Sequence, residues 1–318
     1  MKFCSQSHSL EKNILFKIPS VRGILKRRYK LSDMNWFKVG GKAEVLFFPN
    51  DLKDLQNLIK KIDKNIPISV IGAGSNTLIR DGGLGGIVIK LGKPFCKLEV
   101  LKMNKVRVGA AYNCIKLSRK LVKENLSGLE FFTGIPGTVG GAIFMNAGAF
   151  DVQTSNVLEE IKVLDQEGKI KRLFKEELKM SYRSALIPDN SIIIEATFLC
   201  KKDKANKILD KIKCLEKKRS RSQPIKKATG GSTFKNPKNK KAWKLIKDSG
   251  CEGMFVGKAK LSEMHSNFII NEGSCSSNDI ETLGENIRKK VKDSFGVDLE
   301  WEIKIIGSKN KYKRFFHD

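Results

Sequence analysis

Two glycine-rich segments carry the most distinctive chemical pattern in the sequence. The first, at residues 72–76, reads Gly-Ala-Gly-Ser-Asn and follows an apolar run. It begins like a dinucleotide-binding fingerprint, but Thr77 stands where the third glycine belongs, and strand-like rather than helical sequence follows. Glycines this dense still let backbone N–H groups face an anion such as a pyrophosphate. An ordinary glycine turn between strands is the alternative, and this segment alone leaves both open.

The second segment raises the specificity of the pattern. It spans Gly134–Ala142 with the sequence Gly-Ile-Pro-Gly-Thr-Val-Gly-Gly-Ala, and Asn146 follows shortly after. Gly140 and Gly141 allow close approach by a flat ligand, and Asn146 offers both a donor and an acceptor. No lysine follows at the Walker spacing, which argues against a nucleoside triphosphate.

Length and composition favour a globular protein of about two domains. The chain has 318 residues, of which 40% are hydrophobic and 30% charged. No run approaches the roughly 20 apolar residues needed to span a bilayer. The N-terminal segment, Met1–His8, has neither an apolar core nor a small-residue cleavage site, so we expect a cytoplasmic protein with no membrane partner.

The cysteines and the net charge exclude several other classes. Seven cysteines, an odd number without a Cys-x-x-Cys pair, argue against a disulfide framework and a metal site, and buried thiols are expected. Lys and Arg total 61 against 34 Asp and Glu, a net charge of +27. The lysines are spread along the chain without a nucleic-acid motif, so we expect anionic small ligands rather than nucleic acid.

Apolar periodicity predicts an α+β architecture for the chain before residue 223. Helices are expected at 52–62, capped by Asn50 or Asp51, at 114–122 and at 201–222. Strands are expected at seven places: Val45–Phe48, Ile68–Ile71, Ile87–Leu91, Val106–Val108, Ile161–Leu164, Ile170–Leu173 and Ile192–Leu199.

A change in composition at Gln223-Pro224 predicts the start of a second domain. Its expected elements are a helix at 242–249 stopped by Gly250, a strand at 265–271, a long helix ended by Gly296 and a closing strand at 300–306. Asn278 and Glu281 have capping-box spacing at the start of the long helix, and the closing strand is expected to complete a β-α-β unit.

Six motifs, in order, resemble those of the UDP-N-acetylenolpyruvoylglucosamine reductases. Together they span the chain from about Trp36 to Gly307. They are the segments 72–76 and 134–142, Ser-Tyr-Arg-Ser at 181–184, Gly-Gly-Ser-Thr-Phe-Lys-Asn-Pro at 230–237, His-Ser-Asn-Phe at 265–268 and Glu-Ile-Lys-Ile-Ile-Gly at 302–307.

The resemblance implies a flavoenzyme that takes NADPH and a UDP-sugar, forming UDP-N-acetylmuramate for peptidoglycan. It implies a vanillyl-alcohol-oxidase-type FAD-binding region at 1–222, divided near residue 64, a smaller α+β substrate-binding domain at 223–307 and a basic tail at 308–318. We expect a monomer. We also expect non-covalent FAD, because the histidines are only His8, His265 and His317, and none of them lies near the first glycine-rich segment to attach the flavin. The predicted FAD contacts are Gly72, Ala73, Gly74, Ser75, Asn76, Gly134, Ile135, Pro136, Gly137, Gly140, Gly141, Ala142 and Asn146.

Three residues match the family's catalytic positions. Ser232 would donate a proton, whereas Arg183 and Glu302 would steady the enolate-like intermediate. Arginine suits this role because its planar fork holds a carboxylate by two hydrogen bonds. A carboxylate beside an enolate helps only if it is protonated or acts through another group, and strand alternation points Glu302 away from Trp301 and Ile303. A turn hydroxyl, a surface arginine and a solvated glutamate are the structural alternatives.

Other residues of the same motifs are candidates for substrate or nicotinamide contacts: Tyr182, Gln223, Lys235 and Asn236. His265 is not expected to act as a base. The short interval between Arg183 and Ser232 resembles the compact subtype of the family, which lacks a tyrosine-bearing insertion. Two other functions stay open, namely an FAD oxidoreductase of the same fold acting on a sugar or lactone, and a basic binding protein with a degenerate flavin site.

Overall fold

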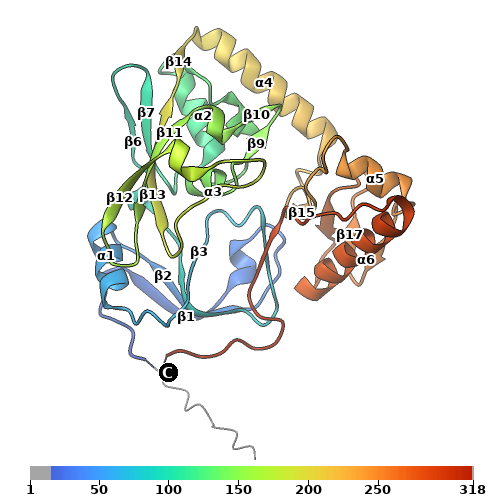
Figure 1. Cartoon of the computed structure of the whole chain (residues 1–318), viewed down its shortest axis with the longest axis horizontal. Helices are drawn as coiled ribbons and strands as arrows, with labels where there is room; N and C mark the ends of the chain where they lie inside the picture. The colour runs from blue at the N-terminus through green and yellow to red at the C-terminus, as the bar shows by residue number, and fades with distance from the viewer. Residues whose placement is uncertain (1–15, 317–318) are drawn as a thin grey trace, which may run out of the picture.

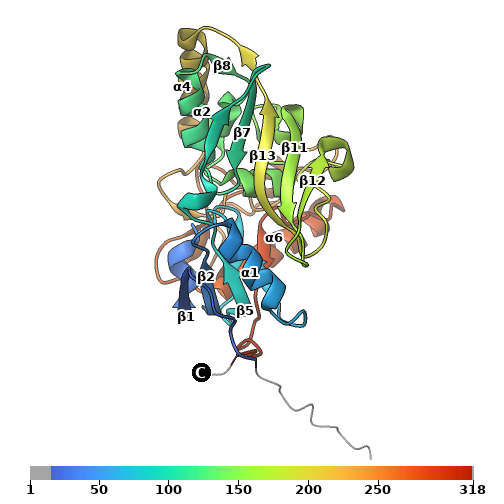
Figure 2. The ribbon, with the colours of Figure 1, turned by 90° about the vertical axis from the view of Figure 1, so that its left-hand side faces the viewer.

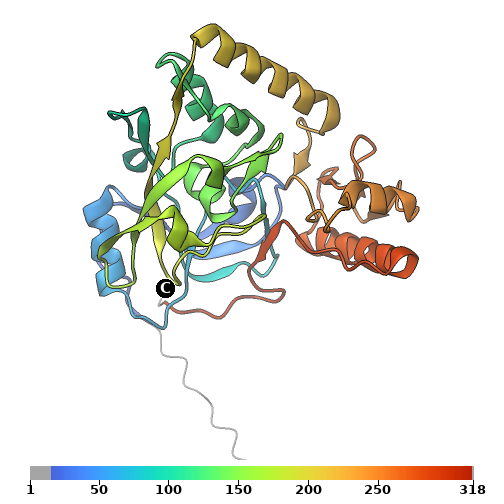
Figure 3. The ribbon, with the colours of Figure 1, turned by 45° about the horizontal axis from the view of Figure 1, so that its top comes forward.

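The computed structural model describes residues 16–316, so Cys4 and the N-terminal segment Met1–His8 lie outside the described residues. Figure 1 shows three parts. A sheet with helix α1 lies at the bottom, a second sheet with α2 and α3 lies above that first sheet, and a C-terminal lobe lies at the right. Seen from the side, the two sheets lie one above the other (Figure 2). Helix α4 crosses from the second sheet to the C-terminal lobe (Figure 3).

The first sheet has the order β1-β2-β5-β3, in which β2, β5 and β3 are parallel and β1 is antiparallel. Helix α1 packs on it through buried leucines, and Asp51 caps it by accepting from the Asp54 N–H, which settles the choice between Asn50 and Asp51. The sheet continues past residue 64, where we expected the first subdomain to end. The elements are β1 Ile24–Lys30, β2 Lys42–Phe48, α1 Leu52–Lys61, β3 Ile68–Val70 and β5 Leu84–Ile89.

The second sheet is antiparallel, with the order β12-β11-β13-β7-β6. Its strands are β6 Leu98–Val100, β7 Lys105–Gly109, β11 Leu158–Leu164, β12 Ile170–Phe174 and β13 Ile192–Leu199. The helices beside it are α2 Cys114–Val122, α3 Val139–Phe144 and α4 Ala205–Ser222. Helix α3 was not predicted, because its glycines hide helical periodicity; it begins inside the second glycine-rich segment, where Thr138 caps it.

The helix predicted at 201–222 begins later than expected. Lys201–Lys202 forms strand β14, which pairs with β8 at Leu126–Ser127, and α4 starts only at Ala205. A two-stranded pair of β9 Gly148–Ala149 and β10 Val152–Gln153 follows α3. Short 3-10 turns lie at Leu31–Met34, Lys93–Phe95, Glu130–Gly134, Thr154–Asn156 and Lys175–Leu178.

The C-terminal lobe packs two helices on an antiparallel sheet of order β15-β18-β17-β16. The predicted strand at 265–271 is shorter than expected, because His265–Phe268 forms a turn closed by the Phe268 N–H and the His265 carbonyl. Gly250 and Gly296 end the helices with positive φ, as predicted. The bounds are β15 Ala228–Thr229, α5 Ala242–Asp248, β16 Phe255–Val256, β17 Ala259–Leu261, β18 Ile269–Asn271 and α6 Ser277–Phe295.

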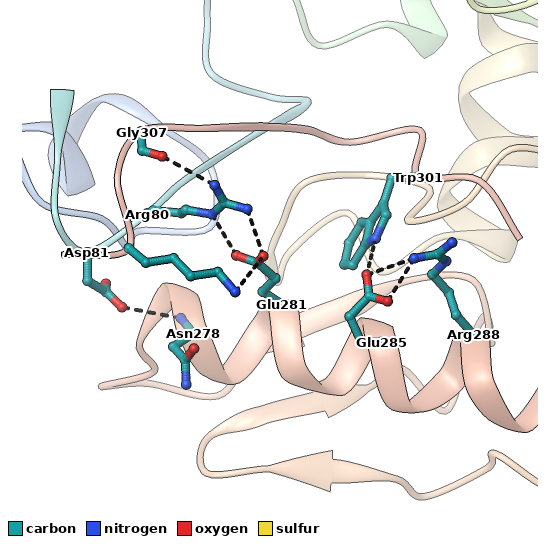
Figure 4. Close-up of polar contacts among 9 residues, drawn as sticks. Arg80, Asp81, Asn278, Glu281, Glu285, Arg288, Trp301 and Gly307 are labelled. Carbon is teal, nitrogen blue, oxygen red and sulfur yellow. Dashed lines mark hydrogen bonds and ion pairs between the residues drawn. The ribbon is translucent and has the colours of Figure 1, made fainter. Parts of the chain in front are cut away.

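Helix α6 begins differently from the prediction. The capping box is formed by Ser276 and Asp279, not by Asn278 and Glu281. Glu281 instead forms a double contact with Arg80 at 2.8 and 2.9 Å, and Asp81 accepts from the N–H group of Asn278 at 3.2 Å (Figure 4). The start of α6 is therefore fastened to the first part of the chain.

The closing strand also returns to the first part of the chain. Strand β19, Lys304–Ile306, pairs in parallel with β4, Thr77–Ile79, so the β-α-β unit predicted within the C-terminal lobe is wrong. Residues beyond it run along the first sheet, where Phe316 is buried and donates its N–H to Glu44 at 2.8 Å. The C-terminal lobe is thus connected at both ends of its sequence.

The described cysteines only partly follow the prediction. Cys114, Cys200 and Cys251 are buried, and burial raises the pKa of the Cys200 thiol to about 12. Cys214 is exposed on α4, contrary to the expectation of burial. Within residues 16–316, no helix combines the length and apolar character that crossing a bilayer requires.

Candidate active site

A cavity of about 900 Å³ lies where the three parts of the molecule meet. This volume falls within the range of roughly 300–1,000 Å³ common for small-molecule and cofactor sites. Both glycine-rich segments line it, together with residues 229–232 and the side chains of Arg183, Glu302 and Lys304.

The two glycine-rich segments touch each other at one side of the cavity. A Cβ on Gly72 would lie 2.7 Å from the Thr138 Oγ1 atom, so a larger residue there would separate the segments. The Lys90 ammonium donates to the carbonyl of Gly72, and burial lowers the pKa of Lys90. The first loop is therefore held between the second loop and the half-buried Lys90.

Three other glycines leave open space facing the cavity. A Cβ built on Gly137, Gly141 or Gly231 would meet no protein atom closer than 3.6, 3.4 and 4.0 Å respectively. Protein packing does not require glycine at Gly137 or Gly141, yet added side chains would occupy the cavity. The surface formed by these three glycines, called the cradle below, fits a flat ligand that lies against the backbone.

Every predicted FAD contact except one lines this cavity. The exception is Asn146, which is fully buried and adopts a left-handed φ of 40°. Its side-chain amide donates to the Ser181 carbonyl at 2.8 Å, and its oxygen accepts from the Ser155 N–H at 2.9 Å. Asn146 therefore ties the second loop to the segment that carries Arg183 and does not face the cavity.

Arg183 and Glu302 form an ion pair at the cavity edge. Arg183 Nε lies 2.6 Å from Glu302 Oε1, and an Nη atom of Arg183 donates to the Gly148 carbonyl at 3.2 Å. Both side chains are largely buried, with 19% and 13% of their surfaces exposed. Arg183 has a left-handed φ of 56°, a costly conformation that directs its side chain toward Glu302 and the cavity.

The backbone of Glu302 is fixed from two directions. Its N–H donates to the Thr233 carbonyl at 2.9 Å, and its carbonyl accepts from the Asn76 side chain at 3.1 Å. Burial raises the pKa of the Glu302 carboxyl, against the opposing pull of the Arg183 and Lys235 cations. The predicted alternation holds, because Glu302 lines the cavity whereas Ile303 is buried in the core and Trp301 packs against that core.

Ser232 lines the cavity from the other side of the same corner. It follows Gly231, whose φ of 84° forms a turn that other residues rarely adopt. The next residue, Thr233, is fully buried and donates its N–H to the Asn267 carbonyl at 2.8 Å. A serine hydroxyl on a rigid loop thus shares a cavity with an ion pair that includes a carboxyl of raised pKa.

Comparison with known proteins identifies the family of this chain. Residues 43–173 match the description "FAD binding domain", and residues 223–306 match the C-terminal domain of UDP-N-acetylenolpyruvoylglucosamine reductase. A reductase of that name from Methylorubrum extorquens is 43% identical over 302 residues, covering 95% of this chain and 97% of the relative. The chain belongs to the UDP-N-acetylenolpyruvoylglucosamine reductase family.

Two further relatives of the family extend the match. A reductase from Rickettsia conorii is 42% identical over 290 residues, covering 91% of this chain and 98% of the relative. The crystal structure of the reductase from Thermus caldophilus superimposes with a TM-score of 0.80 at 30% identity, covering 90% of this chain and 100% of that one. The prediction of an FAD-binding domain joined to a smaller α+β domain is confirmed, and members of this reductase family are FAD-dependent oxidoreductases.

The candidate substrate contacts divide into two groups. Gln223 lines the cavity, whereas Tyr182, Lys235 and Asn236 lie beyond its lining. The Asn236 N–H donates to the Tyr182 hydroxyl at 3.4 Å, and Lys235 pairs with Glu300 at 3.0 Å. These three residues form one cluster beside the Arg183–Glu302 pair, since the Arg183 guanidinium lies 4.9 Å from the centre of the Tyr182 ring.

His265 is held by contacts within its own turn. Its Nδ1 atom accepts from the Asn267 N–H at 3.2 Å, and its ring packs 4.8 Å from the ring of Phe268, which lines the cavity. Burial lowers the pKa of His265.

Sequence reasoning missed three cationic residues that line the cavity: Lys64, Arg219 and Lys304. Arg219, near the end of α4, donates to the Gln223 side chain at 3.1 Å, and burial lowers its pKa. Lys304 lies two residues after Glu302, and its ammonium is 5.8 Å from the centre of the Phe144 ring. Strand alternation could have found Lys304, because residues 302 and 304 share a face.

Proposed function

We propose that this protein reduces the enolpyruvyl group of UDP-N-acetylenolpyruvoylglucosamine, with NADPH as reductant, to give UDP-N-acetylmuramate for peptidoglycan synthesis. The observation that carries the proposal is the buried Arg183–Glu302 pair in the same cavity as Ser232, beside a glycine-lined cradle. Bound FAD supplies hydride transfer between the two substrates.

Ser232 is the proposed proton donor. Reduction of a carbon–carbon double bond next to a carboxylate requires one hydride and one proton, which go to neighbouring carbons. The Ser232 hydroxyl delivers the proton to the carbon α to the carboxylate. Its loop is held by buried Thr233, so the donor keeps a fixed position in the cavity.

Arg183 and Glu302 act on the negative charge that develops on the substrate. The guanidinium can bind the enolpyruvyl carboxylate with two hydrogen bonds, and its left-handed backbone and its contact with the Gly148 carbonyl aim it. Burial favours the protonated form of Glu302, in which the carboxyl can donate a hydrogen bond to an enolate-like oxygen. In that form Glu302 would not repel the intermediate, as a carboxylate would.

The remaining polar residues would hold the rest of the substrates. We assign the substrate-binding role to residues 223–307. Gln223, Lys235 and Asn236 of this domain, together with Tyr182 of the preceding region, would contact the sugar nucleotide or NADPH. The short stretch between β13 and Ser232, occupied by α4, supports the compact subtype without a tyrosine-bearing insertion. We propose a monomer with non-covalently bound FAD, acting in the cytoplasm.

One set of spectroscopic measurements tests the proposal. The purified protein should be yellow and release FAD on denaturation. NADPH should bleach the flavin faster than NADH, because a basic cavity can hold the extra ribose phosphate. Anaerobic addition of UDP-N-acetylenolpyruvoylglucosamine should then restore the colour. Flavin that is reoxidised only by oxygen would favour a sugar or lactone oxidase, and a protein that cannot be loaded with FAD would contradict the proposal.

A further inference from the structure

Trp301 lies between helix α6 and the loop that carries Ser232, and it directly precedes Glu302. We propose that Trp301, seated on Gly284 and Glu285 of α6, is a positioning residue that holds Glu302 in register with Ser232. The inference rests on the proposed function for its kinetic consequence, and its geometry stands on contacts within this chain.

The indole is hydrogen-bonded to α6. Its Nε1 atom donates to Glu285 Oε1 at 2.7 Å, and Arg288 holds the same carboxylate at 2.7 and 3.0 Å (Figure 4). Arg288 also donates through Nε to the Leu299 carbonyl at 2.8 Å. The helix therefore grips the chain just before Glu302 through both a side chain and the backbone.

A glycine in α6 makes room for the indole. A Cβ on Gly284 would lie 2.1 Å from Trp301 Cη2 and 2.4 Å from Cζ2. Glycine is unfavourable inside a helix relative to alanine. Here it allows Trp301 to sit directly on the helix surface, which links the position of the indole to the position of α6.

The other side of the indole faces the loop that carries Ser232. The ring of Trp301 lies 5.1 Å from that of Phe234, two residues after the serine. Backbone hydrogen bonds on either side of Trp301 join the same segments, from the Lys235 N–H to Glu300 at 2.8 Å and from the Glu302 N–H to Thr233 at 2.9 Å. The serine loop and the glutamate segment are therefore joined through the backbone on both sides of the indole.

The loop is secured independently by Asn267. Its side chain accepts from the Phe234 N–H at 3.0 Å and donates to the Phe234 carbonyl at 2.8 Å. Helix α6 is in turn fastened to the first part of the chain through Arg80 and Glu281. A shift of Trp301 would thus move Glu302 against a loop that stays in place.

A change of this kind has a selective kinetic effect. Reoxidation by the enolpyruvyl substrate needs the proton donor and Glu302 together, whereas reduction by NADPH uses neither. A misplacement of about 1 Å can cost on the order of 10²-fold in rate. Loss of the register should therefore slow the second half-reaction and spare the first.

Gly284→Ala and Trp301→Phe test the contact from both sides. Gly284→Ala should slow reoxidation by the enolpyruvyl sugar nucleotide at least about tenfold and change flavin reduction by NADPH less than about twofold. In the Trp301→Phe background, added Gly284→Ala should cost much less, because phenylalanine lacks the atoms that meet the new methyl group. Lys289→Ala, at an exposed site on the same helix, is the control and should change neither rate.

A second readout is independent of the substrate. Moving Glu302 out of its buried position should bring its pKa back toward its ordinary value. Glu302→Gln changes Tm by an amount that depends on pH. This pH dependence should be smaller when Glu302→Gln is made in Gly284→Ala than when it is made in Lys289→Ala. If the pH dependence is the same in the Gly284→Ala and Lys289→Ala backgrounds, or if Gly284→Ala slows both half-reactions equally, the positioning role is wrong. Failure of the wild-type protein to be reoxidised by the sugar nucleotide would instead contradict the proposed function.

Discussion

The glycine-rich side of the cavity presents mainly backbone to its ligand, whereas the opposite corner presents side chains that are themselves tightly held. At Gly137 and Gly141 the protein leaves space that a Cβ could enter without a clash. At the other corner, Arg183 and Glu302 lie 2.6 Å apart, and the backbone of Glu302 is hydrogen-bonded to two other segments.

This difference suggests a division of labour. A surface of exposed backbone, without side chains, can fit the shape of a cofactor and contributes little to proton transfer. A corner of buried, paired side chains changes the pKa of a carboxyl and can stabilise charge in a transition state. Substitutions on the first side should therefore affect FAD content, and those on the second should affect turnover with FAD still bound.

The largest effect is expected for Gly141→Val. A Cβ at this position meets the protein only at ordinary contact distance, and the valine side chain would extend into the cradle, so the purified variant should contain little FAD. Gly92→Val is the matched control, because it also meets no close protein atom and lies outside the cavity lining. FAD content can be measured by absorbance after denaturation. A normal FAD content in Gly141→Val would contradict the claim that the glycine-rich side of the cavity binds FAD.

Arg183→Lys should lower turnover while leaving FAD in place. Lysine keeps the charge but cannot hold a carboxylate with two parallel hydrogen bonds. A hydrogen bond to a charged group contributes about 1.5–3 kcal/mol, so kcat/KM for the sugar nucleotide should fall at least about tenfold. FAD content should stay normal. Arg172→Lys, whose guanidinium pairs with Glu160 away from the cavity, is the control. Near-normal turnover in Arg183→Lys would mean that Arg183 is peripheral.

The smallest expected effect concerns stability and pH. The pKa of Glu302 is higher in the folded protein than its ordinary value of 4.5, so the folded state binds more protons between the two values. The free energy of unfolding should therefore fall as pH rises through that interval. Because glutamine does not titrate, the Tm of the wild type minus that of Glu302→Gln should be largest below pH 4.5 and decline above it. A difference that grows with pH would contradict the raised pKa.

Much of the fold followed from local pattern, and the failures share a physical cause. β13 and the end of α6 at Gly296 agree with apolar periodicity and glycine capping. The partner of β19 could not be predicted, because its pairing with β4 joins residues that are far apart in sequence. The capping box was misplaced because Glu281, at suitable spacing, is used by Arg80 instead.

The candidate site was predicted unevenly for similar reasons. Motif order brought Ser232, Arg183 and Glu302 to attention, and all three line one cavity. Asn146 was assigned to the cofactor because its amide could serve any partner. Only the fold reveals that the Ser181 carbonyl and the Ser155 N–H occupy that amide. Arg219 was missed because a lysine-rich helix gives no sign of which cation faces inward.

The most direct test of the two-sided account is the Ser232→Ala variant, followed through each half-reaction by stopped-flow absorbance. The account predicts normal FAD content and a rate of flavin reduction by NADPH close to that of the wild type. Reoxidation by UDP-N-acetylenolpyruvoylglucosamine should slow by at least the roughly 10²-fold typical of losing an acid catalyst. Equal slowing of both half-reactions would mean that Ser232 shapes the flavin site, and slowing of neither would mean that another group delivers the proton.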